Sequence, residues 1–166
     1  MHSLGDYERF KFPYVKLHRY EVWTNNQLGG IGGRGGFNKA GEYTYLLSND
    51  GTAQYLSISR IIDKAKGETS PSGASNCVFS SDSKEECENF ISWLNTKFTR
   101  FFVAINISKL TGILTNDYFR FVPAPLLKED GTYNWNIKYT DDLLYKHYNL
   151  DSKYIKVIEA VIKERK

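Results

Sequence analysis

A single helical stripe of large apolar side chains constrains the fold of this chain more than any other feature. Between residues 87 and 105 apolar residues recur at steps of three and four, the spacing of a helix with one buried face: Cys87, Phe90, Ile91, Leu94, Phe98, Phe101 and Ile105. Ser83 and Glu86 form a capping box before the stripe, in which the Ser83 hydroxyl accepts an N–H of the first turn and Glu86 reaches back to another. The pattern predicts one long central helix packed into the core.

Lys97 and Arg100 stand one turn apart beside this stripe. Because packing of the stripe would fix the helix, cations outside its buried face would be held rigidly, which suits an anionic partner. The plainer alternative is a core helix whose basic residues are simply solvated.

The first eighty residues are rich in strand-forming residues, and the rest of the chain has helical patterning. Strands are predicted at residues 14–23, 42–48, 53–62 and 77–80, with Asp50-Gly51 as a hairpin turn. Thr140 is expected to cap a second helix that runs through residue 148, and Asp151 a third. The predicted fold class is α+β, with a small mixed or antiparallel sheet in the N-terminal half, a long central helix and two short C-terminal helices. We expect one domain over residues 1–166, with a variable β-rich part at 10–80 and a helical part at 81–166.

The composition is that of a folded globular protein, with 41% hydrophobic and 15% aromatic residues. The net charge of +3 permits an acidic partner such as nucleic acid without demanding one. Cys77 and Cys87 form neither a disulfide framework nor a zinc-ligand spacing, so we expect two reduced thiols and a cytoplasmic location. No segment has the length and hydrophobicity of a membrane span or a signal peptide.

A glycine-rich stretch surrounds Arg34 at residues 28–37. It lacks the Gly-Lys-Ser/Thr ending of a phosphate-binding Walker loop, and it leads into a predicted strand where a dinucleotide fingerprint requires a helix. It is therefore interpreted as a flexible structural loop or as a loop that contacts nucleic acid, with a nucleotide pocket the least favoured of the three. Hydrolase and zinc-protease signatures are also absent from the sequence, so no catalytic residue, cofactor or metal site is predicted.

Several blocks in the C-terminal half follow one another in the order of a known family. They are Thr96-Lys97-Phe98-Thr99-Arg100-Phe101, then Phe121-Val122-Pro123, then Thr140-Asp141-Asp142-Leu143-Leu144-Tyr145-Lys146-His147-Tyr148-Asn149-Leu150, and finally Ile155 with Ile158-Glu159. This series resembles the C-terminal region of adenine-specific DNA methyltransferases of bacterial restriction–modification systems. The resemblance covers roughly residues 77–162, and residues 10–76 resemble the family only loosely. In those enzymes this region belongs to the part that recognises the DNA target.

The chain departs from that family in its catalytic motifs. It contains no Pro-Pro, and therefore no Asn/Asp-Pro-Pro-Tyr/Phe motif to hold a flipped adenine, and its glycine run lacks the setting of an S-adenosylmethionine site. The family also tends to have Trp where this sequence has Tyr139, with Trp135 slightly upstream. The resemblance therefore implies a separated recognition module, which is a fragment, a split subunit or a relic, and which does not transfer methyl groups by itself.

The resemblance implies two partners, double-stranded DNA and a catalytic methyltransferase or restriction chain. Lysine and arginine side chains fix a protein on phosphates, and polar side chains read base edges. The candidates for phosphate contact are Lys16, Arg19, Lys39, Lys97 and Arg100. The candidates for base reading flank the glycine loop, although ordinary turn chemistry would also explain them: Asn25, Asn26, Gln27, Arg34 and Asn38.

Two other functions remain open. One is a protein–protein docking subunit of a restriction–modification complex, in which aromatic surface binds the catalytic chain and DNA contact is minor. The other is a small nuclease, which is the weakest alternative because the sequence lacks a convincing carboxylate–lysine cluster.

Overall fold

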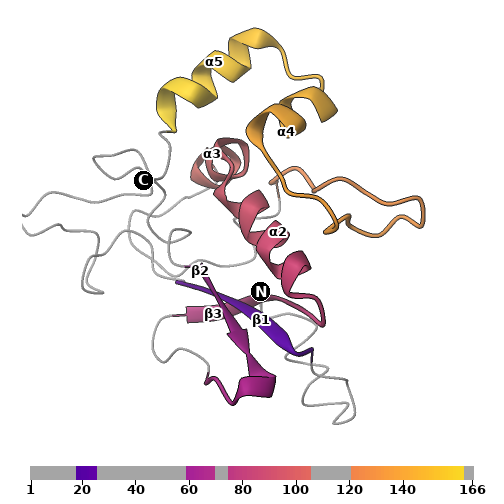
Figure 1. Ribbon diagram of the computed structural model, residues 1–166. Helices are drawn as coiled ribbons and strands as arrows, with labels where there is room; N and C mark the ends of the chain where they lie inside the picture. The colour runs from indigo at the N-terminus through magenta and orange to yellow at the C-terminus, as the bar shows by residue number, and fades with distance from the viewer. Residues whose placement is uncertain (1–17, 26–58, 70–74, 106–120, 163–166) are drawn as a thin grey trace, which may run out of the picture.

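A computed structural model describes residues 18–25, 59–69, 75–105 and 121–162 of the chain. In these residues a three-stranded antiparallel sheet lies at one end, and four helices extend from it to the other end (Figure 1). The predicted α+β class, with strands before helices, is confirmed.

The sheet has the order β2-β1-β3, so that the first strand is central. Its strands are β1 (Tyr20–Asn25), β2 (Ser59–Asp63) and β3 (Ser75–Ser81), and a 3-10 turn, η2 (Lys64–Lys66), follows β2. Val22 of β1 pairs with Ile61 on one side and Phe79 on the other, and it is fully buried. The predicted strands at 14–23, 53–62 and 77–80 each overlap one of these strands. The predicted strand at 42–48 and the hairpin at Asp50-Gly51 lie outside the described residues.

The single long helix predicted from the apolar stripe is wrong, because the structure has two helices in its place. α2 (Lys84–Asn95) ends and α3 (Lys97–Ile105) begins at Thr96, whose extended ψ of 146° interrupts the helical path. The Thr96 hydroxyl donates to the Trp93 carbonyl at 2.8 Å and accepts the Thr99 N–H at 3.2 Å. One threonine therefore closes α2 and caps α3, which a periodic apolar pattern cannot reveal.

The start of α2 is where the capping signal predicts it, although only half of the capping box forms. Ser83 accepts the Glu86 N–H at 3.3 Å. The Glu86 carboxylate instead accepts the hydroxyl of Ser81, and Ser81 Oγ in turn accepts the Ser83 N–H at 3.0 Å. The end of β3 therefore supplies the hydrogen bond that Glu86 was expected to give, which ties the strand to the helix.

The two C-terminal helices begin at the predicted caps. α4 (Asp141–His147) follows Thr140, which accepts the Leu143 N–H at 3.2 Å. α5 (Ser152–Val161) follows Asp151, which accepts the Lys153 N–H at 2.9 Å. α3 contacts both helices, which cover it at the end of the molecule away from the sheet (Figure 1).

One core runs from the sheet through α2 and α3 to α4 and α5, and its largest aromatic group centres on Trp135. The Trp135 ring packs edge-on against Phe90 and Phe79 at centroid distances of 5.1 and 5.3 Å, while those two rings stack at 4.6 Å. Asn89 of α2 donates to the Trp135 carbonyl at 2.8 Å and holds the 121–139 segment in place. No helix in the described ranges is both long and apolar enough to cross a membrane.

Candidate nucleic-acid interface

The structure describes four of the ten residues that the sequence analysis assigned to DNA contact. Arg19 lies directly before β1, Asn25 lies at the end of β1 opposite Ser75, and Lys97 and Arg100 lie in α3. The other six lie outside the described residues: Lys16, Asn26, Gln27, Arg34, Asn38 and Lys39.

Arg19 is anchored to the sheet. Its Nε and Nη2 atoms each donate to a different oxygen of Asp63 at 2.9 Å, and its backbone N–H donates to Asp82 at 3.0 Å. The hydrogen bonds from this guanidinium hold the pKa of Asp63 below its usual range. The Arg19 side chain is 47% exposed, so a pre-positioned cation remains accessible at this end of the sheet.

Arg100 does not stand beside the buried face of the helix, as the sequence analysis expected, because its side chain is fully buried. The break at Thr96 changes the direction of α3 relative to α2, so the stripe continues into α3 only through Phe98, which is buried, and Phe101, which packs against the core. Thr99 and Arg100 turn inward, while Ile105, the last member of the predicted stripe, is 59% exposed. A guanidinium with no exposed surface cannot reach a phosphate in this conformation.

Lys97 is also largely withdrawn from solvent, with a side chain only 13% exposed. Its ammonium forms an ion pair with Glu159 of α5, and Glu159 Oε1 accepts the Tyr145 hydroxyl at 2.8 Å. Burial raises the pKa of Glu159, but the hydrogen bonds from Lys97 and Tyr145 outweigh it and leave this pKa below its usual value. Lys97 therefore joins α3 to α5, a structural role that the sequence analysis did not assign to it.

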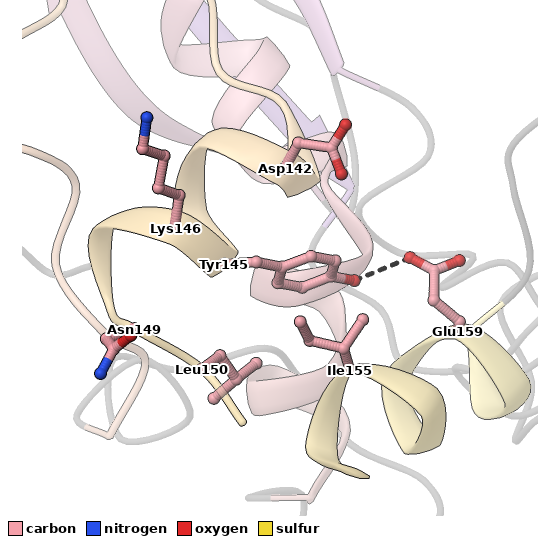
Figure 2. Close-up of a pocket in the computed structure, with 7 residues that line it drawn as sticks. All are labelled: Asp142, Tyr145, Lys146, Asn149, Leu150, Ile155 and Glu159. Carbon is pink, nitrogen blue, oxygen red and sulfur yellow. Dashed lines mark hydrogen bonds between the residues drawn. The ribbon is translucent and has the colours of Figure 1, made fainter. Parts of the chain in front are cut away.

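An open pocket of about 510 Å³ lies between α4 and α5 (Figure 2). Tyr145 points from α4 across this pocket to Glu159. Burial raises the pKa of Tyr145 above its usual value, so its phenol stays protonated at neutral pH while Glu159 stays ionised. The seven residues around the pocket are Asp142, Tyr145, Lys146, Asn149, Leu150, Ile155 and Glu159. The Tyr145–Glu159 pair is thus a fixed hydrogen bond between helices, not a proton-transfer pair poised near neutral pH.

The carboxylate of Asp141 makes a second tie between helices. Asp141 Oδ1 accepts the Phe98 N–H at 2.8 Å, which places an acidic group at the first turn of α3. Burial raises the pKa of Asp141 despite the backbone N–H groups of Phe98 and Lys97 that hydrogen-bond to it. The first turn of α4 therefore holds the first turn of α3.

The basic side chains of α4 and α5 were not among the residues predicted to contact DNA. Lys146, Lys153 and Lys156 are exposed, and Lys153 and Lys156 lie one turn apart on α5. The signal was present in the sequence, because these lysines alternate with the inward-facing Ile155 and Ile158 at helical spacing.

An exposed apolar pair lies on the hairpin-like segment between residues 121 and 139. Leu127 and Tyr133 form an isolated antiparallel bridge, and they are 57% and 51% exposed. The turn between them closes through the Lys128 N–H, which donates to the Thr132 carbonyl at 2.8 Å. The docking alternative requires exposed apolar surface, and this pair provides it.

No protein-family model, curated protein or solved structure matches this chain.

Proposed function

We propose that this chain is a DNA-binding target-recognition module of a restriction–modification adenine methyltransferase or restriction enzyme, and that it works without the catalytic half. The observation that carries the proposal is the way the resembling blocks interlock. Lys97 of the first block pairs with Glu159 of the last, and the Phe98 N–H of the first donates to Asp141 of the third. The residues behind the resemblance are thus the ones that hold the helices together, as expected of a shared scaffold that carries a variable recognition surface.

The exposed cations fit such a module. Arg19 is held in one orientation by Asp63, and fixed cations restrict how a protein can sit on phosphates. The lysines of α4 and α5 add positive charge at the opposite end of the described structure. Because the catalytic motifs are absent from the sequence, target binding and methyl transfer would reside in different chains or domains.

The test is a titration of the chain with a duplex of mixed sequence at several salt concentrations. With about three to five phosphate contacts, log affinity should fall against log salt with a slope of roughly −3 to −5. An acidic polypeptide with a charge similar to that of the duplex is the control. A module that fits a duplex should bind this polypeptide much more weakly than DNA. The Arg34→Ala variant should lose preference among DNA sequences, because an arginine side chain can pair with the major-groove edge of guanine. Binding indifferent to salt would contradict the proposal.

A second assay checks the separation from catalysis. The chain is incubated with duplex DNA and S-adenosylmethionine labelled on its methyl group, and label on adenine is measured. We expect none, and labelled adenine would overturn the assignment to a recognition module.

The docking function is favoured by one specific observation, the exposed Leu127 and Tyr133 pair. In that function the chain binds its catalytic partner through this apolar surface, and binding should be nearly indifferent to salt. Leu127→Ser with Tyr133→Ser should then abolish binding to the catalytic partner and leave DNA affinity unchanged.

A further inference from the structure

We infer that α4, the turn after it and α5 form a helix–turn–helix whose second helix enters the major groove of DNA. This inference rests on the proposed function and names the element that performs it. The residues predicted from the sequence to read bases flank the glycine-rich stretch, far along the chain from these helices. The structure offers a second surface, at the end of the molecule away from the sheet (Figure 1).

The connection between the two helices has the length and conformation of such a motif. Only residues 148–151 separate α4 from α5, and helix–turn–helix units use turns of three or four residues that often contain glycine. Asn149 takes the left-handed conformation that glycine usually supplies, with a φ of 46°. The Asn149 N–H donates to the Lys146 carbonyl at 3.1 Å and the Leu150 N–H donates to the Tyr145 carbonyl at 2.9 Å. The turn is therefore closed by backbone hydrogen bonds.

Apolar side chains on the inward faces of both helices pack into the same core. Leu144 of α4 and Ile158 of α5 are almost completely buried, and Leu150 and Ile155 pack against the same core. The ion pair between Lys97 and Glu159 then fixes α5 on α3. A recognition helix needs such rigid support, because base contacts require a fixed register.

The outward face of α5 has the chemistry of a groove-reading surface. Ser152, Lys153, Lys156 and Val157 are exposed at positions that share one side of the helix, and the first three lie in its N-terminal half. Residues in that half of a recognition helix contact base edges. Lysine binds phosphates or guanine, serine bonds to several bases, and an apolar side chain contacts the thymine methyl group.

Charge complementarity selects DNA as the occupant of this face. The outward positions 152, 153, 156 and 157 of α5 carry two lysines and no acid. α4, the turn and α5 hold four acids, and three of them are already engaged. Asp141 accepts the Phe98 N–H, Asp151 caps α5 and lies 3.8 Å from the Lys153 ammonium, and Glu159 is paired with Lys97, which leaves Asp142. The exposed lysines of α4 and α5 are Lys146, Lys153 and Lys156. In a helix–turn–helix the first helix crosses the DNA backbone, which suits Lys146 near the end of α4.

The experiment compares two charge-matched variants of the full chain in duplex binding at low salt. One is Lys153→Ala with Lys156→Ala on α5. The control is Lys66→Ala with Lys84→Ala, which removes two exposed lysines from η2 and the start of α2. The α5 pair should lose affinity about tenfold or more, and its salt slope should shrink by about two, because each lysine removed would leave one phosphate without its cation. The control should stay within about twofold of the parent, because it changes only the net charge.

The outcomes distinguish failure of the helix–turn–helix inference from failure of the proposed DNA-binding function. If the parent binds duplex DNA and both variants lose affinity equally, the helix–turn–helix inference is wrong while the DNA function stands. If the parent does not bind duplex DNA even at low salt, the proposed function itself fails. Thermal unfolding of each variant checks the fold, and Lys→Ala in a helix should preserve it because alanine is the best helix former. As a second readout, Val157→Ala should change base preference at one position in a selection from randomised duplexes, and an unchanged preference would count against groove entry.

Discussion

The buried threonine at the junction of α2 and α3 gives the sharpest test of the fold. Thr96→Val removes the hydroxyl and keeps the side-chain volume, so no cavity complicates the result. The change leaves the Thr99 N–H without its acceptor, and both residues are buried, with Thr99 completely so. The Trp93 carbonyl still accepts the Thr96 backbone N–H at 3.2 Å.

The magnitude follows from these hydrogen bonds. Loss of a helix N-cap costs about 0.5–2 kcal/mol, and a buried donor left without a partner costs about 1–3 kcal/mol. These costs overlap because they concern the same hydrogen bond, so we expect a loss of about 2–3 kcal/mol in the free energy of unfolding. For a chain of this size that corresponds to a drop of about 4–12 °C in Tm.

The chain provides a matched control for this change. Thr140 caps α4 through the same kind of hydrogen bond, at the same 3.2 Å, but it is exposed. Thr140→Val should cost less, about 0.5–1 kcal/mol, because water replaces the missing acceptor. Thr96→Ser, which keeps the hydroxyl, should also be mild. Denaturant unfolding measures the loss of stability for all three variants, provided that the slope of free energy against denaturant concentration stays constant. If Thr96→Val costs no more than Thr140→Val, the account of the junction is refuted.

Three further predictions concern the ties between helices and the buried thiol. Glu159→Ala should destabilise the fold by about 1–3 kcal/mol and more than Glu159→Gln, which keeps an acceptor for Tyr145; equal losses in denaturant unfolding would show that this acceptor is unimportant. Burial raises the pKa of Asp141, so the folded protein keeps this proton to higher pH than the unfolded chain, and the contribution of Asp141 to stability falls as pH rises through that raised pKa. In the parent, the free energy of unfolding should therefore decrease as pH rises just above the usual aspartate pKa range. Asp141→Asn should abolish this decrease, whereas Asp142→Asn, at the exposed neighbour, should retain it. Burial raises the pKa of Cys87 to about 12, so in native buffer near pH 8 the parent and Cys87→Ala should titrate equally with a thiol reagent, and differ by one thiol only when unfolded.

Sequence patterns predicted the parts of the fold that depend on neighbours in the chain. Ser83, Thr140 and Asp151 were recognised as caps because a cap acts on N–H groups two or three residues away. β1 and β3 were recognised by their strand-forming residues. The sequence therefore sufficed for the fold class and for three of the helix starts.

The break at Thr96 was missed because its causes are partly distant. The apolar spacing continues across it, and Asp141, which accepts the Phe98 N–H in the first turn of α3, lies 43 residues beyond Phe98. The same error misplaced Arg100, because a residue beside the stripe of one continuous helix becomes an inward residue once the second helix takes a new direction. The pairing of Lys97 with Glu159 likewise depends on tertiary packing and has no local signal.

The tie between Lys97 and Glu159 also bears on how the chain folds as it is made. The two residues are 62 positions apart, so at synthesis rates of roughly 5–20 residues per second α3 precedes its partner by about 3–12 s. During that interval the face of α3 that α4 and α5 later cover remains uncovered on the nascent chain. The helical half can close only after α5 has left the ribosome, so this surface is expected to stay available to chaperones until then.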